Sequence, residues 1–231
     1  MSARQIPLEL GHRPALKRED FLVAPSNAAA VAWLDRWPEW PQRALVIHGP
    51  EGAGKSHLAE AWRERSGALR LEADALAGQA LPALAEHALV IEDLDRGVDE
   101  TALFHLYNMM AEAGRFLLLT ARVAPVRWPL RLPDLRSRLL AAPAVALQLP
   151  DEALIGAVLV KTFADRQIRV SEEVILYLLS RMERSFAAVQ EIVAALDRVA
   201  LAERRAITIP LVRQLLHDRD TETPDENRGE N

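Results

Sequence analysis

The chain has 231 residues, half of them apolar, and carries a formal net charge of −5 with no cysteine. This length allows an α/β domain with a smaller helical domain attached, and the lack of cysteine excludes disulfides, thiolate metal sites and a cysteine nucleophile. The lysines are scattered and the arginines alternate with acidic residues, so direct sequence-specific DNA binding is not expected.

Neither a signal peptide nor a membrane-spanning segment is expected. The first residues lack an apolar h-region, and no apolar run approaches the length that crosses a bilayer. We therefore expect a soluble cytoplasmic protein without a membrane partner, which agrees with the absence of cysteine.

Residues 1–20 are predicted to form a flexible leader that contains one compact apolar peptide. A short apolar peptide in such a leader often binds a partner, but the same peptide could equally pack on its own domain. The residues alone leave both alternatives open for Gln5, Ile6, Pro7, Leu8, Glu9 and Leu10.

The first regular elements are a helix and a buried strand. Ser26 is predicted to cap a helix over residues 28–37, which Pro38 and Pro41 end. The apolar run over residues 44–48 then predicts the first strand of a sheet.

The segment after this strand fits the phosphate-loop pattern G-x-x-x-x-G-K-[ST] at every defined position. Lys55 would supply a positive charge for the outer phosphates and Ser56 a hydroxyl for Mg²⁺. A helix expected over residues 57–64 would turn its positive end toward the anion. The predicted nucleotide contacts are Gly49, Pro50, Glu51, Gly52, Ala53, Gly54, Lys55, Ser56 and His57.

A second strand is expected over residues 68–72, then a helix over residues 76–86 broken at Pro82, and a third strand over residues 88–91. The third strand leads directly into Glu92 and Asp93. In phosphate-loop enzymes the first such acid holds the Mg²⁺ shell and the next orients the attacking water. The alternative is a buried strand that simply emerges into a polar turn.

The rest of the α/β part alternates helix and strand. Asp99 is predicted to cap a helix over residues 99–113, whose stripe Leu103, Leu106, Tyr107 and Met110 forms core. A strand over residues 116–120 ends in Thr120, which would contact a γ-phosphate or merely end the strand. A helix over residues 133–139 and a strand over residues 144–149 complete a doubly wound sheet of five parallel strands.

From Asp151 onward every ordered segment is predicted to be helical, over residues 151–166, 171–184, 186–204 and 210–217. Asp151 and Ser171 are the expected caps, the latter close to a capping box. Residues 218–231 carry six acidic and two basic side chains and are predicted to be a disordered tail. We thus expect an α/β domain over residues 21–149 and a helical lid over residues 150–217.

This order of motifs resembles an AAA+ nucleotide-binding module of the P-loop NTPase fold. Four segments further resemble the DnaA family, and within it most closely Hda, the DnaA-related regulatory inactivator. They are Phe21-Leu22-Val23-x-Pro25-Ser26-Asn27, Leu103-Phe104-His105-Leu106-Tyr107-Asn108, Leu132-Pro133-Asp134-Leu135-x-Ser137-Arg138-Leu139 and Ile207-Thr208-Ile209-Pro210-x-Val212. The likeness covers nearly the whole chain.

The resemblance implies a role in the bacterial cytoplasm. It implies that residues 5–10 dock on the DNA polymerase III sliding clamp (the β subunit), and that Arg138 reaches into the site of ATP bound to DnaA. Hydrolysis of that ATP would prevent re-initiation of replication. The nucleotide contacts then extend to Phe21, Leu22, Val23, Thr120 and Arg184, and the family is associated with an ADP-bound form.

Three departures from the family pattern predict a weak or absent intrinsic ATPase: Glu92 stands for the usual Asp, Arg122 lies near the site, and Ala187 replaces the lid arginine. In DnaA a DNA-binding domain follows the lid, whereas here the short acidic segment over residues 218–231 follows it. The alternatives are an autonomous ATPase of helicase-loader or transposition-helper type and a non-enzymatic adaptor. Whether ADP or ATP is the working ligand, and whether the chain forms a homo-oligomer, stays open.

Overall fold

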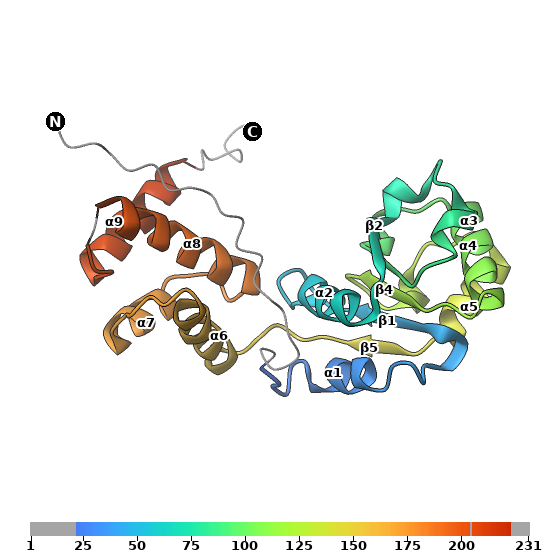
Figure 1. Cartoon of the computed structure of the whole chain (residues 1–231), viewed down its shortest axis with the longest axis horizontal. Coiled ribbons are helices and arrows are strands. Elements are labelled where there is room, and N and C mark those ends of the chain that lie inside the picture. The colour runs from blue at the N-terminus through green and yellow to red at the C-terminus, as the bar shows by residue number, and fades with distance from the viewer. Residues whose placement is uncertain (1–21, 204, 223–231) are drawn as a thin grey trace, which may run out of the picture. The chain divides into compact units, whose positions relative to one another are not determined.

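The computed structural model describes residues 22–203 and 205–222, which form two compact units (Figure 1). The boundary between the units lies between Pro150 and Asp151. The first unit contains the sheet and its helices, and the second contains helices alone. None of the helices in these ranges is both long and apolar enough to cross a bilayer.

The sheet of the first unit has five strands in the order β2-β3-β4-β1-β5, all paired in parallel. They are β1 (Ala44–His48), β2 (Leu69–Glu72), β3 (Leu89–Glu92), β4 (Leu117–Ala121) and β5 (Ala144–Ala146). In the register, both Ala44 and Leu89 lie opposite Leu117. The carboxyl ends of β1, β3 and β4 therefore meet at one edge, as the sequence predicts for this fold.

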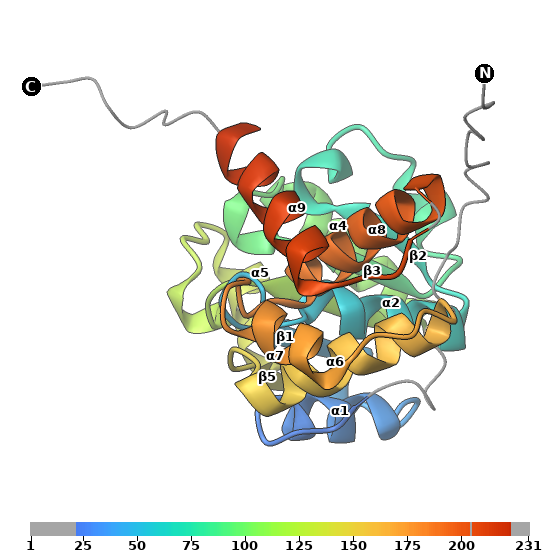
Figure 2. The same ribbon diagram turned by 90° about the vertical axis from the view of Figure 1, so that its left-hand side faces the viewer.

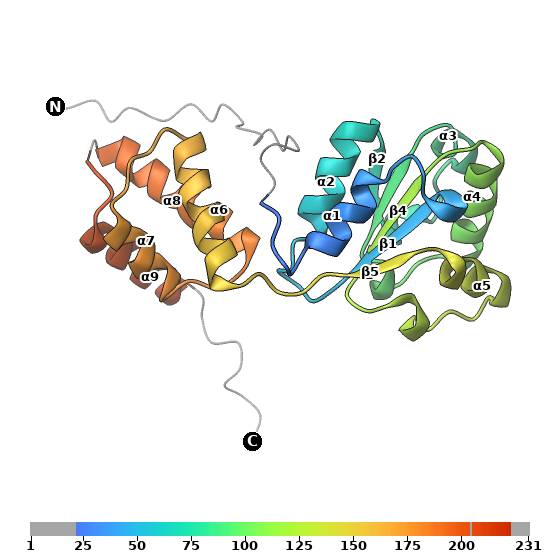
Figure 3. The same cartoon turned by 90° about the horizontal axis from the view of Figure 1, so that it is seen from below.

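Helices cover both faces of the sheet (Figure 3). One face carries α1 (Ala28–Asp35) and α2 (Lys55–Ser66), and the other carries α3 (Leu81–Leu84), α4 (Glu100–Glu112) and α5 (Pro133–Ala141). Side chains alternate along a strand, so Leu89 and Ile91 pack on the α4 side while Val90 packs on the α2 side.

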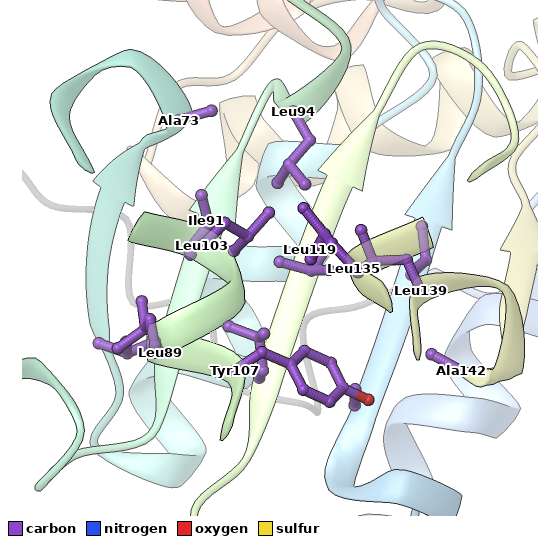
Figure 4. Close-up of a cluster of buried hydrophobic side chains, with 14 of the residues drawn as sticks. Ala73, Leu89, Ile91, Leu94, Leu103, Tyr107, Leu119, Leu135, Leu139 and Ala142 are labelled. Atoms are coloured by element: carbon purple, nitrogen blue, oxygen red, sulfur yellow. The ribbon is translucent and has the colours of Figure 1, made fainter. Parts of the chain in front are cut away.

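The core on the α4 side contains the helical stripe that the sequence predicts. In Figure 4, Leu103 and Tyr107 of α4 and Leu135 and Leu139 of α5 lie over the strands. The four predicted stripe residues are at most 5% exposed: Leu103, Leu106, Tyr107 and Met110. The Asp99 side chain accepts from the Ala102 N–H at 2.9 Å, so the predicted cap is confirmed.

The core on the α2 side is built around tryptophans. Trp40 stacks on Trp62 with ring centroids 5.1 Å apart, and Trp37 meets Trp62 edge-on at 6.2 Å. Phe116, just before β4, lies 5.8 Å from Trp37. Through these contacts, the segment between α1 and β1 packs against α2, the helix that follows the phosphate loop.

The predicted cap of the first helix is wrong. Asn27, not Ser26, is the N-cap of α1, and the helix ends at Asp35. The Asn27 side chain accepts from the Ala24 N–H at 2.9 Å and donates to the Leu22 carbonyl at 3.0 Å. It therefore fixes the turn before the helix, a role that asparagine takes as readily as capping.

Other boundaries differ from the prediction because of glycine and proline. The helix expected over residues 76–86 is reduced to a 3₁₀ turn, Ala73–Leu76, and the single turn of α3. Gly78 has a φ of 80°, which ends the first piece, and Pro82 sits in the first turn, where its missing N–H is harmless. At the sheet edge β5 ends at Ala146, short of the expected residue 149.

The second unit contains four helices within the described ranges, seen together in Figure 2. They are α6 (Glu152–Asp165), α7 (Glu172–Leu179), α8 (Phe186–Glu203) and α9 (Ile209–Glu222). A single apolar cluster joins them, with Leu159 and Phe163 of α6 beside Leu178 of α7, Val193 of α8 and Val212 of α9.

The predicted caps of this unit are half right. Asp151 accepts from the Leu154 N–H at 2.7 Å and caps α6 as expected, but Ser171 makes no capping hydrogen bond at α7. Ser185 instead accepts from the Ala188 N–H at 3.1 Å at the start of α8. The helix α7 ends at Leu179, well before residue 184, and α9 continues to Glu222, five residues into the predicted tail.

Candidate nucleotide-binding site

The phosphate loop joins β1 to α2, and its glycines are required by the backbone. A Cβ on Gly49 would lie 2.5 Å from the Leu147 carbonyl oxygen, so no larger residue fits there. Gly52 and Gly54 have φ angles of 77° and 96°, which favour glycine. The helix α2 begins at Lys55, two residues earlier than predicted, so its first N–H groups belong to the loop.

Lys55 is the cation of this loop. Its side chain is buried, and Nζ donates to the carbonyl oxygens of Gly49 at 2.8 Å and Pro50 at 2.9 Å. Burial lowers the pKa of Lys55, and the nearby carboxylates of Asp93 and Asp95 oppose that shift. The ammonium group is therefore fixed against the loop backbone, where phosphate oxygens would bind.

Glu92 lies beside the start of α2. It is the last residue of β3, is 3% exposed, and accepts a short hydrogen bond from the Ser56 hydroxyl. Its other carboxylate oxygen lies 2.9 Å from Arg70 Nε, in an ion pair whose alignment is too poor for a hydrogen bond. Burial raises the pKa of Glu92, while the Ser56 hydrogen bond acts in the opposite direction.

Asp93 follows with a left-handed backbone, φ 57° and ψ 42°. Its N–H donates to the buried Thr120 hydroxyl at 3.3 Å, so this contact joins the ends of β3 and β4. Its carboxylate forms an ion pair with Arg96 at 3.1 Å. Thr120 is thus a strand-end residue that orients the acidic segment.

Arg122, which the sequence places near the site, is paired with Asp95. Its N–H donates to Asp95 Oδ1 at 3.0 Å and its Nε lies 3.3 Å from Asp95 Oδ2. The Asp95 side chain is 7% exposed, so this pair forms a fixed link between the segments after β3 and β4. Most of the Arg122 charge is therefore compensated inside the chain.

The oxygen ligands fit a phosphate-borne Mg²⁺. The Ser56 hydroxyl and the Glu92 carboxylate lie together beside the loop, and both are oxygen donors that Mg²⁺ accepts. Within the described residues no group of three or more acidic or histidine side chains could hold a metal by itself. Ser56 and Glu92 would hold such an ion only together with phosphate oxygens.

Arg138 is exposed on α5, away from these ion pairs. Its guanidinium lies over the rings of Phe104 at 5.6 Å and Tyr107 at 5.9 Å, both from α4. Across residues 22–203 and 205–222 it forms no ion pair, so no surface salt bridge holds it in this part of the chain. The aromatic rings support the side chain and leave its donors free.

The remaining predicted residues belong to other segments of the chain. Arg184 belongs to the helical unit, where it pairs with Glu152 at 2.7 Å on an exposed surface. Leu22 and Val23 are exposed in the α/β unit, and burial lowers the pKa of His57 on α2. Phe21 and the peptide over residues 5–10 lie outside the described residues.

Sequence reasoning overlooked Arg70. The signal is the alternation Leu69-Arg70-Leu71-Glu72 in a strand beside β3, which points Arg70 and Glu72 to the same face as Glu92. Recognising it requires the order of the strands, because the pairing of β2 with β3 is not evident from the chain alone.

Comparisons with known proteins agree with this architecture. Residues 151–216 match the family model described as the Hda lid domain. Domain III of Thermotoga maritima DnaA superposes with a TM-score of 0.75 at 19% identity, covering 89% of this chain and 97% of that one. The helical unit is therefore similar to the Hda lid domain, and the fold of the chain is similar to that of DnaA domain III.

Other solved structures have a similar fold. AMPPCP-bound DnaA from Aquifex aeolicus superposes with a TM-score of 0.70 at 18% identity, over 93% of this chain and 74% of that one. RuvB T158V from Thermotoga maritima superposes with a TM-score of 0.65 at 14% identity, over 84% of this chain and 68% of that one. The predicted AAA+ fold with a helical lid is thereby confirmed.

A relative by sequence comes from Haemophilus influenzae. That protein, described as uncharacterized, is 29% identical over 191 residues, which make up 76% of this chain and 82% of its own length. Its description names no activity.

Proposed function

We propose that the chain binds ADP or ATP in the loop over residues 49–56 and regulates the DnaA initiator by promoting hydrolysis of DnaA-bound ATP. The observation that carries the proposal is Arg138, an exposed arginine on α5 without an ion-pair partner among residues 22–203 and 205–222. The match of residues 151–216 to the Hda lid domain also supports a regulatory role toward DnaA.

Nucleotide binding is supported by the loop itself. Its glycine backbone, the fixed Lys55 ammonium group and the Ser56 hydroxyl are the three features that recognise a phosphate chain in P-loop proteins. The related DnaA from Aquifex aeolicus is solved with AMPPCP bound. We infer the same class of ligand here, with Mg²⁺ carried by its phosphates.

The intrinsic ATPase should be weak. Glu92 and Asp93, the residues expected to organise the ion and the water, are engaged with Arg70 and Arg96. Arg138 would instead act in trans, because an arginine inserted into a neighbour's site stabilises charge on the transferring phosphoryl group. The activity is therefore assigned to the pair formed with DnaA.

The experiment is a single-turnover assay of ATP bound to DnaA, with and without this protein and with and without clamp loaded on DNA. We expect hydrolysis to accelerate only when both are present. Arg136→Ala is the matched control for Arg138→Ala, because Arg136 is also an exposed arginine on α5. An unchanged DnaA rate with all components present would reject the proposal.

Clamp docking is assigned to Gln5, Ile6, Pro7, Leu8, Glu9 and Leu10. A pull-down of the sliding clamp by the full chain should be lost in the double variant Gln5→Ala with Leu8→Ala. Retention of the clamp by that variant would remove this part of the proposal, while leaving the role of Arg138 to be judged by the hydrolysis assay.

A motor-like ATPase is the second candidate, favoured by the shared fold with RuvB, one structure of which is described as a branch migration motor. It predicts rapid turnover of ATP by this chain alone, lost in Lys55→Ala. Slow turnover alone together with fast turnover beside DnaA favours the first proposal. If ADP only raised the thermal stability of the chain and no hydrolysis rate changed, a non-enzymatic adaptor would be the better description.

A further inference from the structure

The Glu92 carboxylate has a partner on each of its oxygens. Oε2 accepts from the Ser56 hydroxyl, and Oε1 lies 2.9 Å from Nε of Arg70 on β2. In the parallel register Glu92 is opposite Glu72, and Arg70 is opposite Val90, so the Arg70 and Glu92 side chains point to the same face of the sheet.

This pair is asymmetric in its burial. The Glu92 side chain is 4% exposed, whereas that of Arg70 is 42% exposed. A buried carboxylate without a counter-charge is strongly unfavourable, so a cation is needed at Glu92 whether or not a metal ion is present. Arg70 supplies that charge while its outer side remains in contact with solvent.

The neighbouring acids follow the same arrangement. Asp93 pairs with Arg96, and Asp95 pairs with Arg122. Each acid of this segment thus has an arginine partner in the same chain, and Arg70 also lies 3.4 Å from the exposed Glu72 carboxylate. These arginines reduce the negative charge that a nucleotide would meet in this site.

In a phosphate-loop site whose strand-end acid has no internal partner, Mg²⁺ screens that acid from the phosphates. Here Glu92 already has a counter-charge in the guanidinium of Arg70, 2.9 Å away. We propose that Arg70 is the resident counter-ion of Glu92 and makes ADP binding by this chain nearly independent of Mg²⁺. The inference rests on the proposed nucleotide binding and adds which residue sets its metal requirement.

The test is the affinity of the full chain for ADP, measured by titration calorimetry at pH 8 in excess Mg²⁺ and again in EDTA. For the native chain the two Kd values should agree within about threefold. For Arg70→Met the Kd in EDTA should exceed the Kd in Mg²⁺ by about tenfold or more, because Glu92 is left unpaired beside the phosphates.

Two variants sharpen the result. Arg70→Lys keeps the charge and should stay close to the native ratio. Arg63→Met removes an arginine paired with Glu60 within α2 and should leave the ratio unchanged.

The outcomes separate this inference from the proposed function. A native chain that loses about tenfold or more of its ADP affinity in EDTA overturns the role of Arg70 without any variant. An Arg70→Met ratio equal to the native one overturns it as well, while nucleotide binding stands. No ADP binding in either medium would overturn both.

Discussion

The acidic segment beside the phosphate loop and Arg138 on α5 differ in whether their charges are paired within the described part of the chain. Glu92, Asp93 and Asp95 each have an arginine partner within the chain. Arg138 has two aromatic rings beneath it and, in the described part of the chain, no carboxylate partner. The acids beside the phosphate loop are thus paired within the chain, and under the proposed function the charge of Arg138 acts on the ATP of DnaA.

The largest effect is expected from a substitution of the α5 arginine, Arg138. Arg138→Ala should remove most of the stimulated hydrolysis of DnaA-bound ATP, since arginines supplied in trans contribute about 10³- to 10⁵-fold in other systems. ADP binding and clamp binding should persist. Equal loss of all three in Arg138→Ala would indicate damage to the fold rather than loss of a catalytic group, and would count against the assignment.

The loop side is tested by Lys55→Ala. The ammonium group should contribute charge-assisted hydrogen bonds to the phosphates, so we expect the affinity for ADP to fall by about tenfold to a hundredfold. Equilibrium binding of a fluorescent ADP analogue measures this directly. A Kd within about twofold of the native value would show that the loop does not hold the phosphates in the expected way.

A smaller change in ADP affinity is expected from Asp95→Asn, which removes the carboxylate that pairs with Arg122. The amide can still accept from the Arg122 N–H, but the guanidinium loses its carboxylate and Lys55 loses a nearby negative charge. ADP affinity should rise by about threefold at low salt, and the gain should shrink as salt is added. Asp165→Asn, which removes an acid paired with Lys161 in the lid, is the control. Weaker binding by Asp95→Asn would contradict the charge argument.

The smallest effect concerns His57, whose pKa burial lowers below its ordinary value. A depressed folded-state pKa contributes stability that is present above the unfolded pKa, near 6.5, and lost as the pH falls through the folded value. The melting temperature should therefore fall between pH 7.5 and pH 5, and His57→Gln should fall less over the same range. A parallel fall in both proteins would show that other groups govern acid stability.

The sequence predicted the parts of the molecule that depend on local pattern. The phosphate-loop motif, the apolar runs of β1, β3 and β4 and the stripe of α4 carry their structure in a few neighbouring residues. Capping was less predictable, because Ser26 and Asn27 are both good caps and only the turn at Leu22 decides between them.

The charge pairs were harder to foresee than the helices. Arg70, Arg96 and Arg122 are separated by up to 52 positions, and the sheet order that groups Arg70 with Glu92 is a tertiary property. Motif reading therefore found the acids of the candidate site and missed the cation that controls the first of them. The free donors of Arg138 likewise became evident only from its packing on α4.

The tryptophans have a consequence for following the two units in solution. All five, Trp33, Trp37, Trp40, Trp62 and Trp128, lie in the α/β unit, and the lid carries Tyr177 but no tryptophan. Intrinsic tryptophan emission therefore reports on the α/β unit. Because Trp62 lies on the helix that begins at the loop and stacks on Trp40, the emission spectrum provides an optical signal for that unit that requires no added label.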